Sequence, residues 1–121
     1  MRNKALTSLL IFGSIIFVVL GCSFNKAKDI EQLLRSNELS DKMEAYYQIG
    51  ENRDSSYIDL LIINLNDPRL SNNMKFKGMS IYQCKMVALK KISLKTPPHP
   101  ISYRPDNTNI RFYLQWAKQR K

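Results

Sequence analysis

The pattern of apolar and polar positions changes abruptly near residue 22. Residues 5–21 form an apolar run that only three hydroxyl side chains interrupt, and the basic sequence MRNK precedes this run. A basic start followed by a short apolar stretch is typical of a secretory signal peptide. The run also falls short of the roughly 20 apolar residues that a transmembrane helix needs. We therefore expect residues 1–21 to be a signal peptide that is cleaved.

The rest of the chain spaces its apolar residues as helices do, which predicts an all-α fold of about four to five helices. A brief helix is expected from residue 29 to about residue 36. Longer helices are expected within residues 41–49, 56–66, 81–93 and 107–120. The segment TPPHPISYRP, residues 96–105, contains four prolines. Because proline removes a backbone donor and fixes the backbone, we expect an ordered loop there.

Polar residues near the predicted helix ends indicate where each helix begins. The expected N-caps are Ser40 or Asp41, Ser55 or Ser56, Ser80, and Asp106 or Asn107. Gly50 is expected to end the second helix, and Asp67-Pro68 to end the third. In the fourth helix an apolar stripe leaves Lys85, Lys90 and Lys91 for solvent. One face of the last helix is expected to carry Ile110, Tyr113, Leu114 and Ala117.

About a hundred residues follow the apolar run, which is enough for a single hydrophobic core. We expect a tether over residues 22–28 and one helical domain over residues 29–121. Cys84 lies within the apolar stripe of the fourth helix. It is expected to act as a small buried hydrophobe, the alternatives being a free reactive thiol or a link between two chains.

The sequence Val19-Leu20-Gly21-Cys22 resembles the lipobox of bacterial lipoproteins. The resemblance implies that Cys22 is lipidated, becomes the mature N-terminus and anchors the chain in a membrane, because acyl chains give stable attachment. Ser23 at the next position then implies the outer membrane, facing the periplasm, in a diderm organism. The alternative is an ordinary cysteine at the end of an uncleaved anchor helix.

A second resemblance, to HEAT-type helical repeats, covers roughly residues 29–92. The matching residues are Ala45, Ile49, Gly50, Ile58, Leu61, Ile62, Leu65, Asp67, Pro68, Val87, Ala88, Leu89 and Ile92. The basic segment 69–79 stands where the repeat opens its next helix, so this chain departs from the pattern there. The resemblance implies a short stack of helices with one face open to partners. Since the chain holds at most two repeats, the proline loop and the helix of Trp116 are expected to cap the stack.

Charge is distributed unevenly along the chain. Residues 22–68 carry five cations and nine anions, whereas residues 69–121 carry twelve cations and the single anion Asp106. The first segment therefore has a net charge of −4 and the second +11. Such asymmetry favours attraction to an anionic surface or polymer, and pairing between the two halves is the alternative. Export of the protein argues against nucleic acid as the partner.

No catalytic or metal-binding motif is present in the sequence. His99 is the sole histidine, and no ligand set for zinc surrounds it at a recognisable spacing. Three formal catalytic pairs remain: Glu44 with Glu51, Asp54 with Asp59, and Cys84 with His99. We expect no enzymatic activity, no metal and no cofactor.

Three functional interpretations follow, of which the third, an enzyme or an inhibitor of one, has no positive residue-level support. The first is a membrane-anchored envelope lipoprotein that serves as a non-catalytic adaptor or scaffold for another envelope protein. The second is an electrostatic binder of anionic lipid or envelope glycopolymer through the basic half. The candidate binding residues are Lys75, Lys77, Lys90, Lys91, Arg111, Tyr46, Tyr47 and Tyr82.

Overall fold

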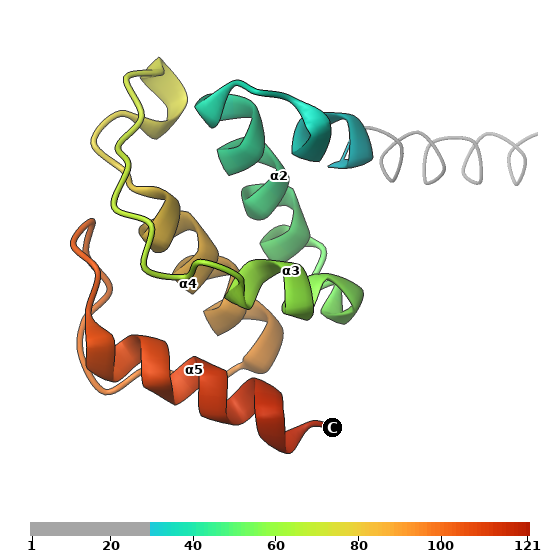
Figure 1. Ribbon diagram of the computed structural model, residues 1–121, viewed down its shortest axis with the longest axis vertical. Helices are drawn as coiled ribbons and strands as arrows, with labels where there is room; N and C mark the ends of the chain where they lie inside the picture. Colours follow the sequence, from blue (N-terminus) through green and yellow to red (C-terminus); the bar gives the residue numbers. More distant parts are fainter. Residues whose placement is uncertain (1–29) are drawn as a thin grey trace, which may run out of the picture. The chain divides into compact units, whose positions relative to one another are not determined.

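The computed structural model describes residues 30–121 (Figure 1). The predicted signal peptide, the predicted lipidation site Cys22 and the predicted tether lie outside the described residues. The chain divides into two compact units, residues 1–32 and residues 33–121. Residues 30–35 are helical, and the remaining elements all belong to the second unit.

The second unit is built from helices joined by ordered connections (Figure 1). In chain order these elements are α2 (Leu39–Glu51), the 3₁₀ helix η1 (Ser55–Tyr57), α3 (Ile58–Ile62), the 3₁₀ helix η2 (Met74–Phe76), α4 (Ile81–Ser93) and α5 (Asn107–Gln119). From residue 30 to the last residue there is no strand, and the only β pairing consists of two isolated bridges in the basic segment 69–80. The predicted all-α fold is confirmed.

The core forms where α2 packs along α4 and where α3 contacts both α4 and α5. Its fully buried side chains come from all four of these helices and include Met43, Ile49, Ile58, Leu61, Tyr82, Met86, Leu89 and Tyr113. Burying such side chains stabilises the fold by about 1.5–3 kcal/mol each. Cys84 is free and buried, as its position in the apolar stripe predicts. No helix within residues 30–121 has the length and apolarity needed to cross a membrane.

Two of the predicted helix starts are confirmed by side-chain caps. Ser80 precedes α4, and its hydroxyl accepts a hydrogen bond from the backbone N–H of Gln83. Asp106 precedes α5, and its carboxylate accepts from the N–H groups of Thr108 and Asn109. Each cap satisfies backbone donors that the helix itself leaves unpaired.

The predicted start and end of α2 are wrong. The helix begins at Leu39, and neither Ser40 nor Asp41 caps it. Instead the hydroxyl of Ser36 accepts from the N–H of Glu38 and donates to Asp41 at 2.6 Å, which ties the preceding turn to the helix. Gly50 does not end α2 either, because the helix continues to Glu51.

The third helix is shorter than expected. α3 spans only five residues and ends at Ile62, since Ile63 is extended and Asn64 is left-handed with a φ of 49°. The carbonyl oxygen of Ile63 accepts a hydrogen bond of 2.6 Å from Nζ of Lys85. Lys85 was expected to face solvent, but its side chain reaches this helix end and only 5 % of the residue is exposed. The expectation for Lys85 is therefore wrong.

One residue of the last helix was also misplaced. Leu114 was expected on one face of α5 together with Ile110, Tyr113 and Ala117, yet it is 39 % exposed whereas those three are buried. The buried face carries Asn109 in addition to Ile110, Tyr113 and Ala117. A buried asparagine needs hydrogen-bond partners, and those partners lie in the proline loop.

Candidate functional site

Helices α2 and α4 approach each other closely at Gly50 and Ala88. A Cβ atom placed on Gly50 would lie 2.9 Å from the Cα of Ala88, which is closer than real Cβ contacts. Glycine is therefore needed at this position to let the two backbones meet. The contact fixes how the neighbouring side chains of α2 lie against α4.

A groove of about 250 Å³ lies between α2, the connection that contains η2, and α4. Most of its lining is apolar or aromatic: Tyr46, Tyr47, Gly50, Phe76, Met79, Cys84, Val87 and Ala88. Lys75 and Lys91 are its two charged lining residues. Tyr47 is 43 % exposed although it is aromatic, so the groove offers apolar surface to a partner.

The two lysines approach one aromatic ring from different elements. Nζ of Lys75 lies 4.9 Å from the centroid of the Tyr47 ring, and Nζ of Lys91 lies 5.2 Å from it. Each lysine also pairs with α2, Lys75 with Glu44 at 2.6 Å and Lys91 with Glu51. An ammonium group has three N–H donors. Each lysine therefore keeps donors for an incoming carboxylate after binding its glutamate.

The pair between Lys75 and Glu44 is charge-assisted. Partial burial acts to raise the pKa of Glu44, but hydrogen bonds from Lys75 and Gln48 outweigh burial and hold that pKa below its ordinary value. The carboxylate is thus ionised at neutral pH. Its pairing orients Lys75 beside the groove.

A second cavity, of about 620 Å³, lies between the C-terminal half of α4 and the proline loop. Its lining consists of Gln83, Val87, Lys90, Lys91, Leu94, Lys95, Thr96, Pro97, His99, Pro100 and Ile101. Three of these residues are lysines and none is acidic. Val87 and Lys91 line both hollows, so the groove and the cavity adjoin along α4.

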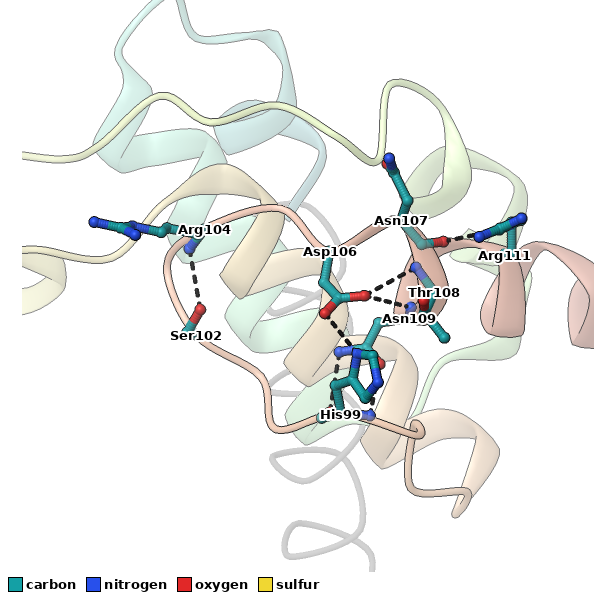
Figure 2. A network of polar contacts seen from close by, with 8 residues as sticks. All are labelled: His99, Ser102, Arg104, Asp106, Asn107, Thr108, Asn109 and Arg111. Atoms are coloured by element: carbon teal, nitrogen blue, oxygen red, sulfur yellow. Dashed lines mark hydrogen bonds and ion pairs between the residues drawn. The ribbon is translucent and has the colours of Figure 1, made fainter.

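The wall that the proline loop contributes is held by the start of α5 (Figure 2). The N–H of His99 donates to Oδ1 of Asn109 at 2.9 Å, and Nδ2 of Asn109 donates to the carbonyl oxygen of His99 at 3.0 Å. Nδ1 of the His99 ring lies 2.8 Å from Oδ2 of Asp106. The contact with His99 and the bonds from α5 hold the pKa of Asp106 below its ordinary value. Asp106 therefore serves both as helix cap and as loop anchor.

Tyr113 anchors the other end of the loop. Its hydroxyl donates to the carbonyl oxygen of Lys95 at 2.7 Å, and the residue is fully buried. Burial raises the pKa of the Tyr113 phenol to about 12. The loop is thus fixed at Lys95 and again at His99.

Replacing Tyr113 with phenylalanine should lower the free energy of unfolding by about 1–2 kcal/mol at neutral pH, because the bond to Lys95 is lost. The deficit should shrink as pH rises from about 10 to about 12. In that range the tyrosine ionises in the unfolded chain but not in the folded one, so the wild type loses stability that the variant cannot lose. Denaturant unfolding of both proteins at pH 7 and at about pH 11 measures this. A deficit that stays constant with pH would contradict the prediction.

The structure brings together half of the candidate binding residues. Tyr46, Tyr47, Lys75 and Lys91 all line the groove. Lys90 lines the second cavity instead. The other three line neither hollow. The backbone of Lys77 forms an isolated β-bridge with that of Ser71, and the Arg111 side chain donates to the Asn107 carbonyl oxygen. Tyr82 is fully buried. The proposed contact through Tyr82 is thus wrong, since its side chain packs in the core.

Several lining residues were not singled out from the sequence as binding residues. Phe76 and Met79 belong to the polar segment after α3, where isolated apolar residues give no periodic signal. Lys95 and Leu94 follow the last turn of α4, and only the return of the proline loop makes them cavity walls. Four prolines within residues 96–105 were the available sign of an ordered wall.

Two structural observations bear on the catalytic and metal-binding pairs considered from the sequence. Within residues 30–121, no group of three or more His, Cys, Asp or Glu side chains is arranged to hold a metal ion. Burial raises the pKa of the Cys84 thiol to about 11, which opposes formation of a nucleophilic thiolate. Cys84 lines the groove, whereas His99 lines the cavity and contacts Asp106.

Comparisons of the chain with protein-family models, with curated proteins and with solved structures find no match. The geometry of the groove and the cavity therefore carries the functional inference.

Proposed function

We propose that this protein is an envelope lipoprotein, anchored through Cys22, that acts as a non-catalytic adaptor for another envelope protein. The observation that carries the proposal is the groove between α2 and α4, where apolar surface and two lysines coincide. In a diderm organism the adaptor would lie on the periplasmic face of the outer membrane.

The volume of the groove favours a side chain over a whole small molecule. Cavities for small-molecule ligands usually measure about 300–1,000 Å³, and the groove is smaller. An aromatic or aliphatic side chain of a partner would fit against Tyr47 and Val87. Buried aromatic anchors of this kind contribute most of the energy at protein interfaces.

The two lysines of the groove determine which residues should lie beside the apolar side chain in the partner segment. Lys75 and Lys91 retain N–H donors at the groove, so acidic residues beside the apolar anchor would complete their hydrogen bonds. Such pairs mainly steer association and set orientation. The partner is thus an acidic segment of an envelope protein with one apolar side chain that enters the groove.

Replacing Val87 with aspartate tests this function. A carboxylate in the groove lining would repel an acidic segment and remove apolar contact, so capture of the partner should fall at least about tenfold. The tagged chain is crosslinked in cells and captured at low and at high salt. Cys22→Ala serves as the unanchored control, in which capture should weaken.

Leu114→Asp is the matched control, because it makes the same chemical change at an exposed position of α5. Circular dichroism verifies that both variants are folded. The proposal is supported if one discrete protein is lost with Val87→Asp and retained with Leu114→Asp. Identical capture by the two variants would overturn it.

A further inference from the structure

The second cavity is lined by positive charge that the described residues compensate only in part. Lys90 and Lys95 line it, and within the described part of the chain neither side chain has an ion-pair or hydrogen-bond partner. Lys91 adds a third ammonium, which pairs with Glu51. No carboxylate belongs to the lining. An anionic group in this cavity would therefore meet two unpaired cations and one paired cation.

The other part of the lining is apolar, and Leu94 is its most unusual member. Leu94 follows the last turn of α4 in a left-handed conformation, with a φ of 59°, and is 72 % exposed. Glycine is the common residue at such a helix end, because a side chain is disfavoured in this conformation. Leucine here relieves no strain and fills no core. What it provides is apolar surface beside Lys90 and Lys95.

The cavity is also shaped in advance. Asn109 holds the backbone of His99 with two hydrogen bonds, and Tyr113 holds the carbonyl oxygen of Lys95. A volume of about 620 Å³ lies within the range of small-molecule sites. Preorganised walls reduce the entropy lost when a ligand binds.

We propose that this cavity binds the headgroup of an anionic phospholipid. The phosphate would lie between Lys90 and Lys95, and the first acyl methylenes would contact Leu94 and Ile101. A phospholipid joins an anionic group to apolar chains, and this lining combines cationic and apolar side chains in the same way. The inference goes beyond the proposed adaptor function and does not rest on it. The groove and the cavity share only Val87 and Lys91 among their lining residues, so the other lining residues of the cavity can be changed without touching the groove.

The test uses short-chain lipids that dissolve as monomers. The full chain, purified in a neutral detergent, is titrated by calorimetry with dihexanoyl phosphatidylglycerol, dihexanoyl phosphatidylcholine and free glycerol phosphate. We expect phosphatidylglycerol to bind at least about tenfold more tightly than either of the others, because only it combines net negative charge with acyl chains. Equal binding of the two lipids would overturn the proposal, and so would equal binding of glycerol phosphate, which would assign the site to a free phosphate.

Two variants with matched controls locate the site. Lys90→Gln with Lys95→Gln should lower the affinity for phosphatidylglycerol at least about tenfold. Lys77→Gln with Arg111→Gln removes the same charge outside the cavity and should change the affinity less than about twofold. Equal losses in the two double variants would show non-specific attraction and would overturn the proposal.

The variant Leu94→Gly tests the acyl contact of the lipid without destabilising the fold. Glycine suits the left-handed conformation, so the variant should be at least as resistant to denaturant as the wild type. Its affinity for phosphatidylglycerol should nevertheless fall by about threefold or more, while the weak binding of glycerol phosphate stays unchanged. A variant that keeps full affinity for the lipid would contradict the assigned acyl contact.

Discussion

Replacing Gly50 with valine should lower the free energy of unfolding by about 2–3 kcal/mol, because α2 and α4 can no longer meet. Even a Cβ atom at this position would lie 2.9 Å from the Cα of Ala88. A backbone atom cannot move aside as the tip of a side chain can, so the helices must separate. Valine is a better helix former than glycine, but that gain is only about 0.5 kcal/mol. Chemical denaturation of the two proteins measures the difference.

Gln48→Val provides the control for Gly50→Val. Gln48 lies on the same helix and is half-buried, and among residues 30–121 its side chain bonds to Glu44 at 3.1 Å. We expect this control to lose less than about 1 kcal/mol. Comparable losses in both variants would mean that the close approach of α2 and α4 does not limit stability. Partner capture should fail with Gly50→Val as well, since separated helices no longer shape the groove.

The role of Gly50 shows where a local pattern is ambiguous. A glycine near the end of an amphipathic helix pattern predicts the end of the helix, but a close contact between two helices also requires glycine. The choice depends on Ala88, which lies 38 residues later in the sequence. By contrast, Ser80 and Asp106 were predicted correctly, because a cap involves only the next three residues. The resemblance to HEAT-type repeats stays a prediction.

Lys85 shows a similar limit for charged residues. Lys85 was expected to reach solvent. Instead the residue is buried, and its ammonium group donates a hydrogen bond to the Ile63 carbonyl oxygen. Burial holds the pKa of Lys85 below its ordinary value, although Asp67 acts to raise it. Nothing in the periodicity of α4 marks the position of that carbonyl. The early end of α3, which exposes the carbonyl, was not predicted either.

The shape of the groove and of the second cavity depends on the segments that connect the helices more than on the helices themselves. Tyr46 and Tyr47 could be singled out because aromatic residues are enriched at interfaces. Lys75 and Lys91 could be singled out because clustered basic residues attract anionic partners. Their convergence on one groove depends on how the segment after α3 returns to α4, which the sequence pattern does not encode. The wall of the second cavity depends in turn on Asn109, which the pattern placed on no particular face.

Replacing Asn109 with alanine should lower the free energy of unfolding by about 2–4 kcal/mol. The side chain is fully buried and makes two hydrogen bonds with the backbone of His99 (Figure 2). Its removal breaks both bonds, each of which contributes about 0.5–1.5 kcal/mol, and leaves a cavity in place of a fully buried side chain. Denaturant unfolding measures the loss, and limited proteolysis should show faster cleavage within residues 96–105.

Asn107→Ala is the control, because Asn107 is an exposed residue in the same first turn of α5 and it engages Arg111 through its backbone oxygen alone. This control should change the stability by less than about 0.5 kcal/mol. If Asn109→Ala were equally harmless, the proline loop would be held by its own rigidity instead of by α5. If it behaves as expected, the loop wall depends on one buried amide, and phosphatidylglycerol binding should weaken even though Lys90, Leu94 and Lys95 are all retained.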